Sequence, residues 1–129
     1  MLLLEVALPL PGRSKKWAAV EKDLLRAEEE FRNGNYHSCV SSCRTVIQEL
    51  GHKRFSNKSW AEPLLTRLSS ERKEMSKNER EGAIWGAVRH YTHQAHHSDS
   101  EGGISEYSRA EAQLILTLTS AFVAHAGIA

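Results

Sequence analysis

The chain has 129 residues, a length typical of one domain, and its 40% hydrophobic residues are enough to fill one core. Its 17 basic and 16 acidic side chains give a formal net charge of +1, which excludes the overall positive field that drives non-specific nucleic-acid binding. A charged fraction of 26% and a mean hydropathy of -0.47 exclude an integral membrane protein. We therefore expect a soluble protein that holds any polyanion through a local site.

Residues 1–13 are expected to form an extended arm. Apolar residues alternate with others between Leu4 and Leu10, the period of an extended segment that packs on one side. A secretory signal peptide is the less favoured alternative, because the segment lacks a basic start and a small-residue cleavage site. Residues 14–129 are expected to form a single helical domain.

Two antiparallel helices are predicted at the start of this domain. Over Ser14–Asn33, apolar residues recur at steps of three and four, the spacing of one helix face. The Asn33–Asn35 turn supplies a left-handed stop at Gly34 and an N-cap at Asn35, so the next helix must fold back. That helix is predicted over Tyr36–Leu50, with Gly51 as its stop.

The second helix carries Cys39 and Cys43, the only cysteines of the chain. Two cysteines do not make a disulfide framework, which favours a reducing, cytoplasmic location. Both continue the apolar stripe of the helix, so we expect them to be reduced and buried. Arg44 is placed near the same stripe, where an ion pair with a buried glutamate and a contact with substrate are both open interpretations.

The segment His52–Lys58 is basic and without periodicity, which indicates a loop. Lys53, Arg54 and Lys58 surround Phe55, so they are candidates to bind an RNA backbone while the phenyl ring stacks on a base. A solvated loop is the plainer alternative.

Three further helices are expected. A short one has Pro63 in its first turn, and capping boxes start the other two at Ser76 and Ser108. The helix from Ser76 is expected to reach His97, the segment Ser98–Tyr107 to be a loop, and the last helix to end at Gly127. The residues expected to face inward on the first two of these helices are Leu64, Leu65, Leu68, Ile84, Trp85, Val88, Tyr91, Thr92 and Ala95.

The last helix is apolar nearly all round between Leu114 and Val123. Either it lies at the centre of the bundle or it also lies in a subunit interface. No convincing strand pair occurs, so the predicted fold is all-α, an up-down bundle of four to five helices.

The strongest chemical signal is the segment Arg89–His97, which holds an arginine and four of the seven histidines. On a continuous helix Arg89 and His96 project from one face about 10 Å apart along the axis, with His93 between them. A guanidinium and titratable imidazoles can bind a phosphodiester and move protons around it without a metal or another cofactor.

Two other interpretations of this segment stay open. His93 has metal-ligand spacing to both His96 and His97, and Asp99 follows, although Arg89 would place a positive charge beside the ion. A composite zinc site of Cys39, Cys43, His93 and His97 is also open. The segment is also compatible with a solvated helix end whose histidines interact with the helix dipole.

Arg89, His90 and His96 resemble the motif of the HEPN superfamily, small helical bundles with an arginine, a polar residue and a histidine after four to six intervening residues. The antiparallel first pair, with its Gly-Asn-Tyr turn and an arginine in the second helix, is similar to this family too. His93 and His97 leave open which histidine matches.

The resemblance implies a metal-independent endoribonuclease, active as a homodimer with a composite site and typical of defence or toxin-antitoxin systems with a partner or antitoxin. It implies that Arg89 stabilises charge on the phosphorane, that His96 transfers protons, that His90 orients the arginine or the phosphate and that His93 assists. Other members are inactive modules for dimerisation or for binding a nucleotide or a partner, possibly within longer proteins, so the resemblance supports this alternative as well.

Overall fold

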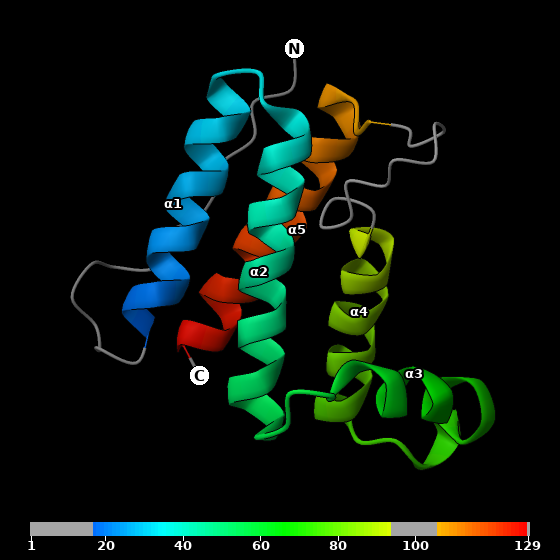
Figure 1. Cartoon of the computed structure of the whole chain (residues 1–129). Coiled ribbons are helices and arrows are strands. Elements are labelled where there is room, and N and C mark those ends of the chain that lie inside the picture. The colour runs from blue at the N-terminus through cyan, green and yellow to red at the C-terminus, as the bar shows by residue number, and fades with distance from the viewer. Residues whose placement is uncertain (1–16, 94–105, 129) are drawn as a thin grey trace.

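A computed structural model describes residues 17–93 and 106–128, with only the backbone of residues 127 and 128. The described residues are helical and contain no strand, so the all-α prediction is confirmed (Figure 1). The expected arm at residues 1–13 lies outside them, as does most of the expected Ser98–Tyr107 loop. The helices are α1 Ala18–Arg32, α2 Tyr36–Phe55, α3 Ala61–Ser70, α4 Lys77–Tyr91 and α5 Arg109–Ile128, with the short 3₁₀ helix η2 Arg72–Glu74 between α3 and α4.

The predicted antiparallel pair of α1 and α2 is confirmed. Gly34 takes a φ of 79°, a left-handed value that favours glycine, and the amide of Asn35 donates to the Glu30 carbonyl at 2.8 Å. The expected cap differs in one respect, because the Asn35 side chain makes no capping hydrogen bond to α2. The tight turn brings the apolar faces of the two helices together without this cap.

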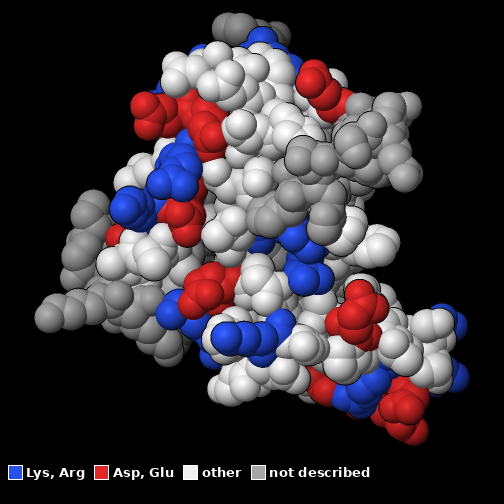
Figure 2. All heavy atoms as spheres, in the orientation of Figure 1, with Lys and Arg blue, Asp and Glu red and all other residues white. Residues whose placement is uncertain are grey.

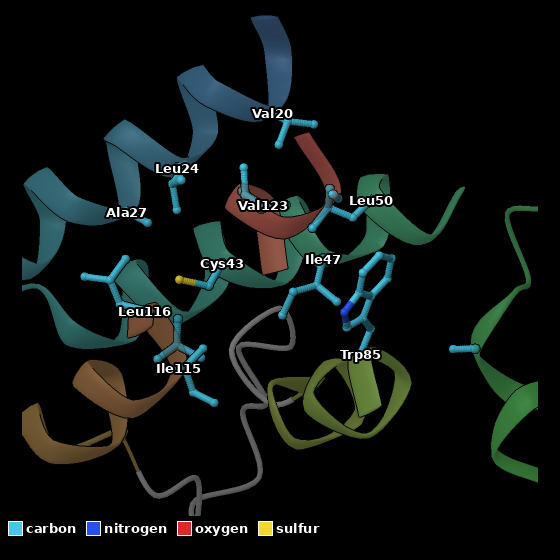
Figure 3. Close-up of a cluster of buried hydrophobic side chains, with 14 of the residues drawn as sticks. Val20, Leu24, Ala27, Cys43, Ile47, Leu50, Trp85, Ile115, Leu116 and Val123 are labelled. Atoms are coloured by element: carbon cyan, nitrogen blue, oxygen red, sulfur yellow. The ribbon is translucent and has the colours of Figure 1, made fainter. Parts of the chain in front are cut away.

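Helices α1, α2 and α5 pack against one another, α4 packs on α2, and α3 lies across the first turns of α4 (Figure 1). The four long helices run alternately up and down, whereas α3 stands outside this bundle. Figure 3 shows the core between them, with Trp85 reaching from α4 toward Ile47 and Leu50 of α2. Both cysteines are free and fully buried, as predicted. A hydrogen bond with Cys39 and burial raise the pKa of Cys43.

Helix α2 is longer than predicted, because Gly51 does not end it. The helix continues to Phe55, and Ser56, with a left-handed φ of 53°, follows its last residue. Gly51 serves packing instead: a Cβ there would overlap the indole ring of Trp60, which is only 2% exposed. The expected loop over His52–Lys58 is therefore wrong for its first four residues.

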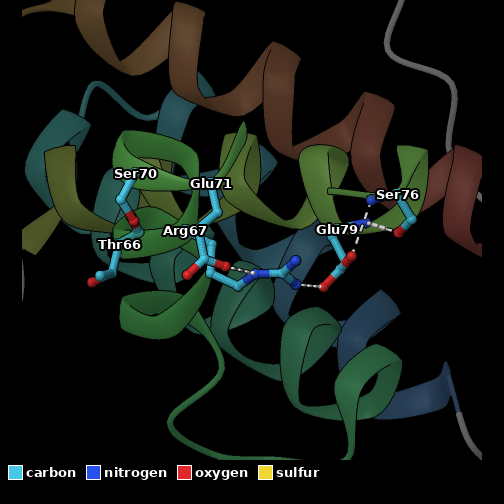
Figure 4. A network of polar contacts seen from close by, with 6 residues as sticks. All are labelled: Thr66, Arg67, Ser70, Glu71, Ser76 and Glu79. Atoms are coloured by element: carbon cyan, nitrogen blue, oxygen red, sulfur yellow. Dashed lines mark hydrogen bonds and ion pairs between the residues drawn. The ribbon is translucent and has the colours of Figure 1, made fainter. Parts of the chain in front are cut away.

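Helix α4 starts at the predicted capping box, in which Ser76 and Glu79 bond each other's backbone amides (Figure 4). Glu79 also pairs with Arg67 of α3, whose guanidinium lies between it and Glu71. The helix ends at Tyr91, before the expected end at His97.

Several residues expected to face inward do not. Leu65 is half-buried and Leu68 is exposed, whereas Leu64 is buried. Ile84 and Tyr91 are exposed on α4, and Ala95 lies outside the described residues. The described residues therefore cover the apolar stripe of α4 only in part.

Helix α5 starts at the predicted capping box of Ser108 and Glu111 and continues through Gly127, which does not end it. Its contacts with both α1 and α2 explain why it is apolar around most of its circumference. Leu114 is the exception, with 54% of its surface exposed. No helix among the described residues is long and apolar enough to cross a membrane.

We predict that Gly51→Ala destabilises the protein by about 1–3 kcal/mol, because the added methyl group must displace the buried Trp60 ring. Gly86→Ala is the matched control within a helix: its Cβ would meet Ala61 and Leu65 at 3.4 Å, an ordinary contact. This control should be neutral or gain up to about 1 kcal/mol from helix propensity. Urea unfolding measures both variants, and equal stability of Gly51→Ala and wild type would contradict the packing described.

Candidate functional site

Arg89 lies in the last turn of α4, partly buried against α2. Its Nε donates a hydrogen bond to Oε1 of Gln48, and Nε2 of Gln48 donates to the Lys58 carbonyl at 2.9 Å. Gln48 is thus held from the other side, so its amide oxygen stays directed at Arg89. This bond occupies the Nε of the arginine and leaves its two terminal nitrogens for another acceptor.

Arg44 stands one turn before Gln48 on the same helix, and its Nη2 lies 3.4 Å from Nδ1 of His93. A guanidinium can only donate, so Nδ1 of His93 must be the acceptor in this contact. Burial lowers the pKa of Arg44, and the neighbouring Arg89 lowers it further. The site therefore joins two arginines from facing helices and one imidazole.

The positive charge of this group is not balanced by a nearby carboxylate among the described residues. The ion pairs there involve Arg32, Lys53, Arg54, Arg67 and His125, and neither Arg44 nor Arg89. Figure 2 shows basic side chains gathered between α2 and α4 on this face. Two adjacent guanidinium groups without a carboxylate are suited to bind an oxyanion.

Hydrogen bonds fix the end of α4 beside the site. The buried Thr92 donates from its hydroxyl to the Arg89 carbonyl at 2.8 Å, and the Tyr107 hydroxyl donates to the Tyr91 carbonyl at 2.7 Å. His93 consequently follows the helix instead of continuing it. The expectation of a continuous helix carrying Arg89, His93 and His96 on one face is therefore wrong.

The structure brings His93 to the arginines by another route, through the contact with Arg44. His90 is exposed in the last turn of α4. His96 and His97 lie outside the described residues. Of the expected catalytic residues, Arg89 and His93 are thus placed in one site.

The three candidate RNA-binding residues have different surroundings. Lys53 pairs with Glu49 at 3.4 Å, and Lys58 is exposed after the end of α2. Arg54 bonds Asn78, lies 3.9 Å from Glu81 and covers the Trp85 ring at 4.8 Å from its centroid. Its side chain is engaged in joining α2 to α4.

Phe55 is also part of the packing between these helices. Its ring stacks on Trp60 with centroids 6.1 Å apart and meets the edge of Trp85 at 6.5 Å. It also fills the space above Gly82, where a Cβ would overlap it. These contacts explain why an aromatic residue stands in so basic a segment.

The described residues contain no group of three His, Cys, Asp or Glu side chains close enough to hold a metal ion. Cys39 and Cys43 are fully buried members of the hydrophobic core, and Figure 3 shows Cys43 among the apolar side chains there. Their position is that of core residues, as the apolar stripe of α2 predicts.

Sequence reasoning missed Gln48, because an amide on a helix carries no signature of its own. Gln48 follows Arg44 by four residues on α2, so the two side chains are expected on one helix face, and this spacing is the signal in the sequence that links them. For Arg44 the sequence leaves open an ion pair with a glutamate or a contact with substrate, and no glutamate among the described residues pairs with it.

In comparisons with known proteins, no family model, curated protein or solved structure matches the chain.

We predict that Arg54→Ala destabilises the protein by about 1–2 kcal/mol, because it uncovers Trp85 and leaves Glu81 without one of its partners. Lys58→Ala, which removes the same charge from an exposed side chain, should stay within about 0.5 kcal/mol of wild type. Thermal and urea unfolding measure both. If Arg54→Ala and Lys58→Ala lose the same free energy of unfolding, Arg54 has no structural role of its own.

Proposed function

We propose that the protein is a metal-independent endoribonuclease. The observation that carries the proposal is the Arg89 guanidinium, fixed by Gln48 and adjacent to Arg44 and His93, with no carboxylate among the described residues to neutralise it. Charge of this kind stabilises the additional negative charge of a pentacovalent phosphorane. The resemblance of Arg89, His90 and His96 to the HEPN motif agrees with this chemistry.

In the proposed reaction the ribose 2'-OH attacks the adjacent phosphorus. One imidazole takes the hydroxyl proton as the new O–P bond forms, and a second gives a proton to the 5'-oxygen as its bond to phosphorus breaks. The products are a 2',3'-cyclic phosphate and a 5'-hydroxyl. His96 is the proposed proton carrier, His93 assists from its position beside Arg44, and the exposed His90 orients the phosphate.

The second imidazole comes from another chain in this proposal, so the active form is a homodimer. Ile84 and Tyr91 lie seven residues apart on one face of α4 and are exposed, as is Leu114 of the neighbouring α5. Two exposed aliphatic side chains and an exposed aromatic ring on adjoining helices are typical of an interface. By the same resemblance, the partner of such a nuclease would be an antitoxin or another defence component.

The same apolar surface also favours a second function, a catalytically inactive module for dimerisation or for binding a nucleotide or a partner. The near-neutral net charge agrees with it. RNA cleavage distinguishes the two functions.

We predict cleavage of RNA, but not of DNA, in the presence of EDTA, leaving cyclic phosphate ends. His96→Ala and Arg89→Ala should each lower the rate about 100-fold to 10,000-fold, through loss of proton transfer and of charge stabilisation respectively. His97→Ala, whose spacing lies outside the HEPN pattern, is the control and should matter less. Equal activity of His96→Ala and wild type would exclude His96 as proton carrier, and an inactive wild type would favour the binding module.

Light scattering should give twice the mass of one chain at micromolar concentration. Ile84→Glu should shift the protein to monomers, since it buries a charge in the proposed interface. Leu25→Glu changes an equally exposed leucine on α1, at 53%, and should remain dimeric. A monomeric wild type would contradict the homodimer.

A further inference from the structure

Arg44 is not accounted for by the packing of the fold. Its side chain is partly buried, and its Nε is buried without a hydrogen-bond partner. Gln48, which bonds the Arg89 guanidinium, lies one helical turn further along α2, and the charge of Arg89 lowers the pKa of Arg44. Among the described residues, its one side-chain hydrogen-bond contact is with His93. An arginine in these surroundings costs folding free energy, because a buried donor and a neighbouring like charge are both uncompensated.

We propose that Arg44 and Arg89 together bind one phosphate group of an RNA strand between α2 and α4. A phosphate offers the acceptors that both guanidinium groups lack, and its negative charge relieves the repulsion between them. The inference rests on the proposed function for the identity of the strand, whereas the anion site itself does not depend on cleavage.

The geometry assigns different parts to the two arginines. Gln48 holds Arg89 by its Nε, which leaves the paired terminal nitrogens for a bidentate contact. Arg44 comes from the turn before Gln48 and approaches from the His93 side. Because α2 and α4 are rigid helices that pack on each other, the two groups are held in place before the ligand arrives.

The test combines stability with binding. Arg44→Gln removes the charge, Arg44→Lys keeps it without the planar fork, and Arg26→Gln removes an equal charge from an exposed site on α1. In buffer free of phosphate, Arg44→Gln should melt about 2–5 °C above wild type, because the repulsion is gone. A purely structural role for Arg44 predicts the opposite, and a lower melting temperature would overturn the proposal.

Binding is measured with a fluorescent 2'-O-methyl RNA, which cannot be cleaved by 2'-OH attack. Arg44→Gln and Arg89→Gln should each weaken it about 10-fold and lower the slope of log affinity against log salt by about 0.7. Arg44→Lys should recover the slope but not the full affinity, and Arg26→Gln should bind like wild type. If Arg44→Gln binds like Arg26→Gln, the proposal is wrong.

Two competitors separate the possible sources of the phosphate. Inorganic phosphate and adenosine monophosphate should displace the RNA only at concentrations far above that of the RNA itself. Displacement by either at the concentration of the RNA would overturn the assignment to a strand. If the wild type binds RNA through Arg44 but does not cleave it, the proposed nuclease function is wrong and the anion site stands. If the wild type cleaves RNA but RNA binding does not depend on Arg44, the anion site is wrong and the nuclease function stands.

Discussion

The close approach of α4 to α2 is the constraint on which the site depends. The two helices are held together by an aromatic cluster of Phe55, Trp60 and Trp85. Gly51 of α2 leaves room for the Trp60 ring, and Gly82 of α4 leaves room for the Phe55 ring. The Trp60 indole also donates to the Gln48 carbonyl at 3.1 Å, tying the segment after α2 back onto that helix. Bulkier residues at the two glycines would push α4 away from α2.

This packing has a direct consequence for charge. Gln48 makes both contacts: its backbone carbonyl accepts a hydrogen bond from the Trp60 indole, and its side-chain oxygen accepts one from Arg89. The same residue of α2 therefore positions the aromatic cluster and the arginine. Near the C-terminal end of α2, Arg54 also joins α2 to α4, because its guanidinium covers the Trp85 ring. The two arginines near His93 are therefore brought together by the framework, although their own interaction is repulsive. Binding sites commonly keep such local cost where the ligand offsets it.

The local features of the fold could be predicted from the sequence. The turn at Gly34 and both capping boxes depend on neighbouring residues, and the core stripe with Cys39 and Cys43 depends on helical periodicity alone. Errors arose where tertiary contacts decide the outcome. Gly51 has the chemistry of a helix stop, but Trp60, nine residues away, makes it a packing position.

The end of α4 could not be predicted for the same reason. Periodicity extends past Tyr91, but Tyr107, distant in the sequence, bonds the helix terminus. The sequence singles out Arg89 and, with a lesser role, His93, because both stand in a conspicuous segment. His96, the expected proton carrier, lies outside the described residues. The contact of Gln48 and the role of Arg44 depend on which faces of α2 and α4 meet, which the sequence alone does not reveal.

The central claim is that Arg44 and Arg89 form one anion site supported by Gln48. Nuclear magnetic resonance of the arginine Nε–H groups, during titration with inorganic phosphate, tests it most directly. The account predicts that the Arg44 and Arg89 signals shift together along one binding curve, and that Gln48→Leu weakens that curve. Signals that move independently, or a curve unchanged by Gln48→Leu, would contradict the account.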